Sequence, residues 1–329
     1  MKAFANVNPR DPKHAAELLA DARAHGRAAV VAGGGSDLLG LIKERLVTPD
    51  LVVNLKAARG MDRIAADAAG ITIGGQVTLD TISHDPTIRE RYAVLAEAAA
   101  SVGTPQIRNT ATIAGNVCQR PWCWYFRNSF ACLKNGGRFC YAAGGENQFH
   151  AIFGGGPSQI VHPSDTAPAL VALDATFRLQ GPHGDLVVPA ADFFTLPRVN
   201  PARENVLKED EILAEVHVPA PQPAVRSTYH KVLDREAWTH AVVSAAIALE
   251  MDGGVCRAAR IVLGGVAPIP WRLPKVEAML AGRRLTPELC ARAGAAAVQG
   301  ARPLARNGYK VPLTRAMVAR VLGELAARA

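Results

Sequence analysis

Four cysteines crowd into one short segment of this 329-residue chain, and this segment restricts the possible folds more than any other feature. Four, eight and seven residues separate Cys118, Cys123, Cys132 and Cys140. Four thiolates in one loop can hold an iron–sulfur cluster or a zinc ion. The absence of a CxxC pair counts against a zinc ribbon or knuckle. Disulfides are the competing interpretation, and a chain made in the cytoplasm makes them less favoured.

The charge around these cysteines favours an anionic metal cluster. Between Glu97 and Glu146 the sequence has no acidic residue but five basic ones, which are Arg108, Arg120, Arg127, Lys134 and Arg138. A cluster held by four thiolates is anionic, so neighbouring positive charge would stabilise it and raise its reduction potential. We therefore expect a metal cluster here rather than disulfides.

The remaining positive charge gathers near the C-terminus. The formal net charge is +8, and residues 275–329 hold ten Lys and Arg against three Glu. Aromatic residues do not interleave with these arginines, so we expect no nucleic-acid binding. The segment predicts a solvated helical face or a contact with an acidic partner subunit.

A glycine turn follows a short apolar run early in the chain. Ala28–Ala32 predicts a buried strand, and Gly33, Gly34, Gly35 and Ser36 come directly after it. Backbone amides in such a turn can approach a diphosphate closely, and the serine adds a donor. The spacing matches neither GxGxxG nor the Walker pattern, which disfavours ordinary NAD-binding and P-loop folds. Taken alone, a glycine-rich segment of this kind is more often only a turn than a phosphate-binding site.

A second polar segment could serve the same ligand. Thr110 and Thr112 alternate along an expected extended stretch that ends in Gly115 and Asn116. Hydroxyl and amide donors next to a glycine suit a phosphate or a ribityl chain. An exposed strand entering a turn is the alternative.

Two further polar residues have ordinary structural explanations beside functional ones. Asp165 could accept from a ligand hydroxyl or cap a helix that begins near Pro168. Lys231 lies on an expected strand and could reach an anionic ligand, although a solvated lysine is the default.

The order of elements predicts two domains. Three prolines between 219 and 223 favour an extended linker, so we expect domains at 1–221 and 222–329. No apolar stretch approaches the roughly 20 residues needed for a membrane span. No apolar leader is visible at the start, so we expect a cytoplasmic chain. The expected helices are Asp11–Ala24 and Ile88–Ser101, and the expected strands include Leu51–Leu55, Ile71–Ile73, Ala241–Glu250 and Ala258–Val266.

Together these segments resemble a known family. The order AGGGSDLL, TATIAGN, HPSDTAPALVALDA and YHKVLDREAWTHAVVSAAI is similar to the FAD-binding medium subunit of the xanthine dehydrogenase and molybdenum hydroxylase family. The resemblance implies an α+β fold, with a two-lobed FAD-binding domain of the vanillyl-alcohol oxidase (PCMH) type. A C-terminal α+β domain of the carbon monoxide dehydrogenase flavoprotein type would follow it.

The resemblance also implies where FAD would bind. The positions that would hold its diphosphate are Ala32, Gly33, Gly34, Gly35, Ser36, Asp37 and Leu38, continued by Thr110, Thr112, Gly115 and Asn116. Asp165 would bind the cofactor near the second lobe. Leu213 and Lys231 match positions that contact flavin at the domain junction.

Residues at about 117–158 resemble the [4Fe-4S] loop in the FAD subunit of periplasmic aldehyde oxidoreductase. Cys123, Cys132 and Cys140 match its ligands, but Ser158 stands where the family has the fourth cysteine. Cys118 is the nearest spare thiol and is our predicted fourth ligand. A Ser158 oxygen ligand and a labile three-cysteine site are the alternatives.

The function implied by the resemblance is electron transfer within a complex. A separate large subunit would oxidise the substrate at a molybdenum cofactor, and a small [2Fe-2S] subunit would deliver electrons to FAD here for an external acceptor. No residue of this chain would then act on the substrate. The alternatives are the flavoprotein subunit of a 4-hydroxybenzoyl-CoA reductase-type complex, a stand-alone flavin oxidase and, least favoured, a zinc-binding protein. Export beside a signal-bearing partner would place the complex in the periplasm.

Overall fold

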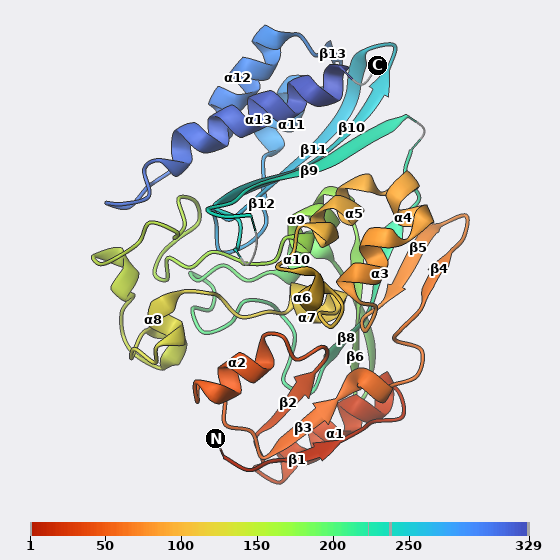
Figure 1. The fold of residues 1–329 in the computed structure, drawn as a ribbon, viewed down its shortest axis with the longest axis vertical. Helices are drawn as coiled ribbons and strands as arrows, with labels where there is room; N and C mark the ends of the chain where they lie inside the picture. Colours follow the sequence, from red (N-terminus) through yellow and green to blue (C-terminus); the bar gives the residue numbers. More distant parts are fainter. Residues whose placement is uncertain (1, 223, 237–238, 328–329) are drawn as a thin grey trace.

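Three sheets with covering helices make up the fold in this computed structural model, which describes residues 2–222, 224–236 and 239–327 (Figure 1). The first sheet is parallel, in the order β1-β3-β2. Helix α1 packs against β2 and β3, and its start is fixed by Asp11, whose side chain accepts from the His14 N–H. The elements of this lobe are β1 (Ala5–Val7), α1 (Pro12–Ala24), β2 (Ala29–Ala32), α2 (Leu38–Lys43), β3 (Leu51–Asn54) and the 3-10 turn Leu55–Ala57.

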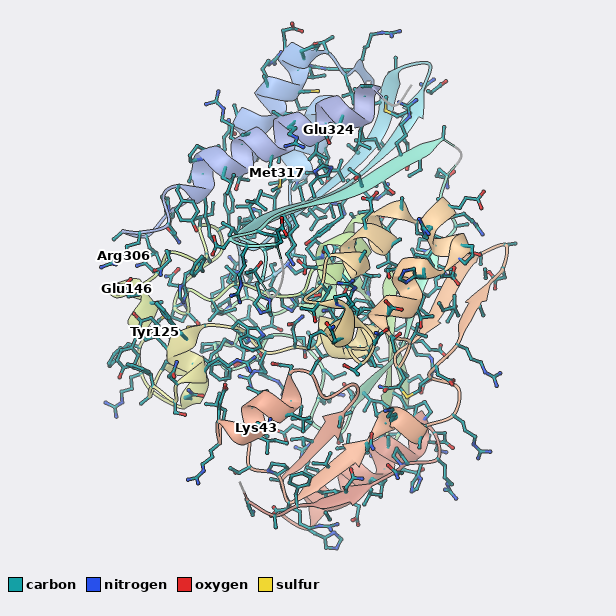
Figure 2. The ribbon with its side chains drawn as sticks, in the orientation of Figure 1. Lys43, Tyr125, Glu146, Arg306, Met317 and Glu324 are labelled. Atoms are coloured by element: carbon teal, nitrogen blue, oxygen red, sulfur yellow. The ribbon has the colours of Figure 1, made fainter. Side chains whose placement is uncertain are left out.

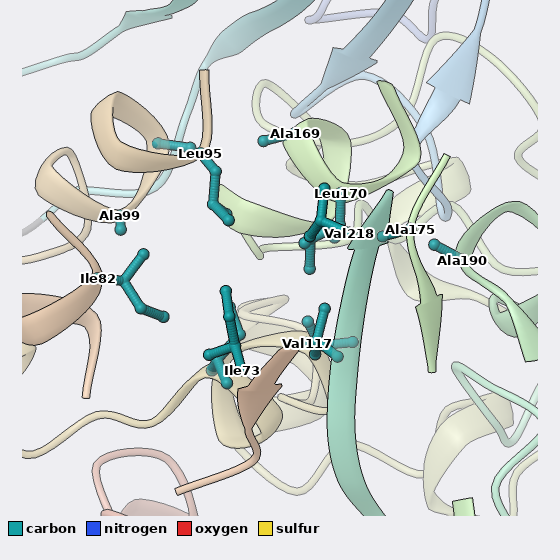
Figure 3. Close-up of a cluster of buried hydrophobic side chains, with 14 of the residues drawn as sticks. Ile73, Ile82, Leu95, Ala99, Val117, Ala169, Leu170, Ala175, Ala190 and Val218 are labelled. Atoms are coloured by element: carbon teal, nitrogen blue, oxygen red, sulfur yellow. The ribbon is translucent and has the colours of Figure 1, made fainter. Parts of the chain in front are cut away.

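The second sheet is antiparallel, in the order β4-β5-β8-β6-β7. Its strands are β4 (Ile64–Ala66), β5 (Gly70–Gly74), β6 (Thr176–Gly181), β7 (Gly184–Pro189) and β8 (Ile212–Pro219). The helices of this lobe are α3 (Leu79–His84), α4 (Pro86–Arg91), α5 (Ala93–Ala100), α6 (Pro105–Arg108), α7 (Ile113–Val117), α9 (Thr166–Ala172) and α10 (Ala190–Phe193). Ile73 and Val218 of the sheet meet Leu95 and Leu170 of the helices in one buried cluster (Figure 3).

The segment between α7 and α9 is mostly irregular. It contains helix α8 (Trp124–Arg127) and two 3-10 turns, Leu133–Asn135 and Tyr141–Ala143. This segment holds the cysteine-rich residues 117–158 and lies at the left of Figure 1, away from the second sheet.

The third sheet belongs to the C-terminal part of the chain. Strands run in the order β12-β11-β10-β9, with β13 paired to β11. Helix α13 covers the strands β9 and β10. The elements are β9 (Val225–Val232), β10 (Val243–Asp252), β11 (Val255–Gly264), β12 (Trp271–Arg272), α11 (Pro274–Leu280), β13 (Arg283–Arg284), α12 (Pro287–Ala297) and α13 (Lys310–Ala327).

The cysteine-rich segment is fastened to the C-terminal part by polar contacts. Arg306 Nη1 lies 2.6 Å from Glu146 Oε1, and both side chains are labelled in Figure 2. Within the segment itself, the Tyr125 hydroxyl accepts from the Glu146 N–H at 2.6 Å. Buried Lys310 donates to the Phe149 carbonyl at 2.8 Å and the Gly265 carbonyl at 2.7 Å. The end of the segment is therefore held by the C-terminal domain.

Sheets and helices together confirm the expected α+β class, but two local predictions were wrong. The helix expected over Ile88–Ser101 is two helices, because Tyr92 leaves the helical region at φ −135° and ψ 47°. The extended stretch expected before Asn116 is instead the start of helix α7. Thr112 caps that helix by accepting from the Gly115 N–H at 3.2 Å.

The sequence predicts no membrane span, and the structure tests this prediction for helices. Among the described residues, none of the helices has the length and apolar character needed to cross a bilayer.

Candidate functional site

A cavity of about 580 Å³ opens where the glycine turn, α7, the cysteine-rich segment and the loop between β9 and β10 meet. That volume lies in the range of ordinary ligand sites, which is roughly 300–1,000 Å³. The lining residues that sequence predicted are Ser36, Asp37, Gly115, Asn116 and Asp165. The lining residues that it missed include Trp122, Trp124, Phe149 and His240.

The glycine turn packs directly on the second polar segment. A Cβ on Gly34 would lie 1.7 Å from the Thr110 carbonyl oxygen, and one on Gly33 would lie 2.8 Å from Thr112 Oγ1. No side chain fits in the first gap, since such contacts are far inside van der Waals distance. The two predicted phosphate-type segments are therefore one structure. Thr110 and Thr112 contribute to it through packing, because neither lines the cavity.

Asn116 joins this structure to the segment before α9. Its side-chain oxygen accepts from Ser164 Oγ at 2.6 Å and from Thr166 Oγ1 at 2.7 Å, and all three residues are buried. Ser164 Oγ also accepts from the Ala167 N–H, so Ser164 caps α9 instead of Asp165. The capping alternative for Asp165 is thus wrong.

The carboxylate of Asp165 is held by two residues of β9. Tyr229 donates its hydroxyl to Asp165 Oδ1 at 2.6 Å, and Lys231 Nζ lies 2.7 Å from Oδ2. The side chains of Asp165 and Lys231 are about 5% and 4% exposed. Burial first, and the nearby carboxylate second, raise the pKa of Tyr229 well above its usual value. Lys231 is therefore not the solvated lysine of the default expectation: it neutralises a buried carboxylate at the cavity wall.

Asp37 connects the glycine turn to the cysteine-rich segment. Arg127 Nη2 donates to Asp37 Oδ1 at 2.6 Å, and the Arg120 N–H donates to Oδ2 at 2.9 Å. The guanidinium of Arg127 also lies over the Trp122 ring at 4.3 Å from its centre. Arg127 is 6% exposed, so this is a largely buried ion pair. Asp37 thus has a structural role that its sequence position did not reveal.

The other predicted cofactor residues lie behind the cavity. Leu213 is buried in the core of the second sheet, and its carbonyl is the closest atom to a Cβ built on Gly75. Ala32 ends strand β2, Leu38 begins helix α2, and Gly35 adopts φ +76° between them. Within the part of the chain that the structure describes, the cavity lining includes none of Ala32, Gly33, Gly34, Gly35, Leu38 and Leu213.

The structure divides the four clustered cysteines. Cys123, Cys132 and Cys140 line one small cavity together with Ser158. Cys118 instead packs against the core of the second sheet, where burial raises the pKa of its thiol to about 12. The structure therefore does not bring Cys118 together with the other three, and it places Ser158 where Cys118 was expected.

The three-cysteine cavity is closed in this conformation. Its volume is about 10 Å³, and aromatic residues such as Tyr125 and Tyr141 fill its surroundings. His150 Nε2 lies 3.3 Å from Cys123 Sγ, and burial raises the pKa of the Cys123 thiol to about 11. Among the described residues, no three His, Cys, Asp or Glu side chains form a group that could hold a metal ion. The donors for a cluster are neighbours, but their present arrangement does not fit one.

Comparisons with known proteins cover the whole chain. A model of the FAD binding domain in molybdopterin dehydrogenase matches residues 2–221, and a model of the CO dehydrogenase flavoprotein C-terminal domain matches residues 228–325. The chain is 34% identical to the aldehyde oxidoreductase FAD-binding subunit PaoB of Escherichia coli over all of both chains. It is 26% identical to the carbon monoxide dehydrogenase medium chain of Hydrogenophaga pseudoflava, covering 96% of each.

Solved structures agree with these relatives. A carbon monoxide dehydrogenase from Hydrogenophaga pseudoflava gives a TM-score of 0.78 at 25% identity, over 99% of this chain and 98% of that one. Quinoline 2-oxidoreductase from Pseudomonas putida gives 0.77 at 25% identity, over 100% and 99%. The chain therefore belongs to the FAD-binding medium subunits of the molybdenum hydroxylase family, of the carbon monoxide dehydrogenase medium-chain type.

Proposed function

We propose that this chain is the FAD-bearing electron-transfer subunit of a molybdenum-dependent aldehyde oxidoreductase or xanthine dehydrogenase-type complex. The observation that carries the proposal is the cavity beneath the glycine turn, in a chain whose FAD-binding family model spans residues 2–221. The aldehyde specificity rests on the relative named as an aldehyde oxidoreductase FAD-binding subunit.

The residues of the cavity suit binding rather than chemistry on a substrate. The turn at 33–35 packs on Thr110 and Thr112 just before Ser36, so its backbone amides would approach a diphosphate from the side of the cavity, and Ser36 in the cavity wall adds a hydroxyl donor. Asp165, neutralised by Lys231, would accept from a hydroxyl of the cofactor. When bound, the flavin supplies a carrier that accepts electrons singly and releases them in pairs.

The proposed partners are a molybdenum-cofactor large subunit, a [2Fe-2S] small subunit and an external electron acceptor. The chain would be made in the cytoplasm and would share the compartment of its partners, including the periplasm if they carry it there. An aldehyde added without oxygen to the purified complex tests this proposal. We expect the flavin absorbance to bleach within turnover times. An unbleached flavin in a complex that still oxidises the aldehyde with an artificial acceptor would refute the route through this chain.

We also propose a [4Fe-4S] cluster in the cysteine-rich segment, with Cys123, Cys132 and Cys140 as ligands. The support is their shared cavity and the resemblance of the segment. Ser158 lines that cavity with the three cysteines and stands where the similar loop has its fourth cysteine, so we prefer it to Cys118 as the fourth ligand. Loading would require this cavity of about 10 Å³ to widen, and it would release protons from the thiols.

Iron content separates these ligand assignments. We expect Cys132→Ser to lose iron relative to flavin and Cys118→Ser to keep it. Ser158→Cys should keep the iron and change the electron paramagnetic resonance spectrum of the reduced cluster. Iron loss in Cys118→Ser with unchanged flavin would restore Cys118 as the ligand. A wild-type complex with full flavin, but with no more iron than the [2Fe-2S] clusters of its small subunit account for, would refute the cluster and leave the flavin proposal standing.

A further inference from the structure

A second cavity lies between the end of the cysteine-rich segment and the C-terminal domain. It is distinct from the cavity at the glycine turn where we propose that FAD binds, which we call the flavin cavity. The volume of the second cavity is about 560 Å³. Its walls come from four separate stretches: the Ala151–Gln159 loop, the loop that carries Arg198, strand β12 and the connection between α12 and α13. Among the described residues, those that line this cavity and those that line the flavin cavity do not overlap. A ligand in this cavity would therefore not compete with FAD for lining residues.

The walls of this second cavity are held by hydrogen bonds. The Arg302 N–H donates to the Ile152 carbonyl at 2.7 Å, which joins the loop to the C-terminal connection. Asn307 Nδ2 donates to the His150 and Ala151 carbonyls at 3.0 and 3.2 Å. Asn307 is fully buried. A cavity whose walls are fixed in this way is preorganised for a ligand.

The floor combines a glycine turn with an aromatic surface. The Trp271 and Phe153 rings stack at 5.3 Å with an interplanar angle of 13°. Gly154, at φ +59°, crosses over the indole so closely that a Cβ there would lie 2.9 Å from it. Glycine is therefore required for the turn to lie on the ring. A planar group entering the cavity would find an indole among its walls.

The donors around this cavity are unused. Arg198 and Arg302 are both exposed, and within the described part of the chain neither guanidinium has a hydrogen bond or ion pair. The same holds for the N–H groups of Gly154 and Gly155 and for the side-chain amide of Gln159. No acidic residue lines the cavity among the described residues. Two cations, two glycine amides and a carboxamide match the oxygens of a phosphate group.

We propose that this cavity binds an organic phosphate that carries an aromatic ring, such as a nucleotide. The guanidinium groups and the glycine amides bind the phosphate, and the indole of Trp271 contacts the ring. Neither the glycine-rich turn at 154–156 nor Arg198 and Arg302 are among the described residues that line the cavity at the glycine turn.

The test uses the complete, flavin-loaded complex and ADP as the probe in isothermal titration calorimetry. We expect saturable binding of ADP, and weaker binding of both adenosine and inorganic pyrophosphate, which each supply half of the contacts. The double variant R198Q/R302Q should weaken ADP binding by about tenfold or more, since two charge-assisted contacts are lost. The matched control R292Q/R315Q removes the same charge at exposed positions outside the cavity and should bind ADP normally.

Three outcomes would overturn the proposal. The first is equal ADP affinity in R198Q/R302Q and R292Q/R315Q. It would show that any loss of affinity comes from the lower net charge and not from contacts in the cavity. The second is ADP binding only after flavin removal, which would assign the signal to the flavin cavity. The third is the absence of saturable ADP binding to the flavin-loaded complex. Trp271→Leu should weaken ADP binding and spare pyrophosphate binding, and equal losses for both would contradict the role of the ring.

Discussion

Arg127→Met tests the connection between the glycine turn and the cysteine-rich segment. The substitution keeps an apolar stem but removes the 2.6 Å ion pair with Asp37 and the hydrogen bonds to the Pro121 and Arg120 carbonyls at 3.0 Å each. Removing one partner of a buried ion pair destabilises proteins by about 3–5 kcal/mol. Asp37 keeps its contact with the Arg120 N–H and is 18% exposed, so we expect the lower end, about 3 kcal/mol.

The assay is denaturant unfolding of the flavin-loaded protein, together with FAD titration of the stripped protein. Asp37 lines the cavity where we propose that FAD binds. If about half of the 3 kcal/mol is lost from the bound state of the turn, FAD binding should weaken about tenfold. Arg138→Met is the matched control, since Arg138 is exposed and lies in the same segment. Equal stability and equal FAD affinity in the two variants would refute the proposed connection.

Three further substitutions probe the remaining contacts. Gly34→Ala should abolish FAD retention, because its Cβ would strike a backbone carbonyl, whereas Gly144→Ala, with open space around it, should retain FAD; flavin absorbance after gel filtration measures both. Lys231→Met should destabilise the protein by about 3 kcal/mol by leaving Asp165 buried without its cation, and an unchanged unfolding midpoint would contradict this. Burial lowers the pKa of Lys310 to about 7 from 10.5. Between those pH values the unfolded chain binds more protons, so this residue should make the unfolding free energy rise with pH, by a few kcal/mol in total. The difference between wild type and Lys310→Met across pH 7–10 isolates that slope, and a flat difference would contradict the assignment.

Local rules predicted the elements whose ends depend on neighbouring residues. The helix expected over Asp11–Ala24 is α1, which begins directly after Asp11, and β9 carries Lys231 as expected. The break at Tyr92 was not predictable, because its ring is fully buried in a core cluster whose members come from distant parts of the chain. Propensity alone favours one continuous Ala-rich helix there.

Site residues were predictable where a local motif determines the backbone conformation. They were not predictable where tertiary packing determines which side chains come together. The glycine turn was predicted from three glycines that follow an apolar run, and the structure adds that a Cβ on Gly34 would strike the Thr110 carbonyl. The position of the Cys118 side chain could not be predicted, because proximity in sequence to Cys123 does not prevent it from packing against the core. Trp122 and Trp124 were also missed, although two exposed tryptophans beside a cysteine form a signal that could have indicated a ligand cavity.

The flavin content of the purified complex tests the central claim most directly. Flavin released by denaturation can be identified by chromatography and counted against the amount of this chain. We predict one FAD per chain in the wild-type complex and a large loss in Gly34→Ala, with Gly144→Ala retaining the full amount. A wild-type complex that contains this chain but no flavin would contradict the account.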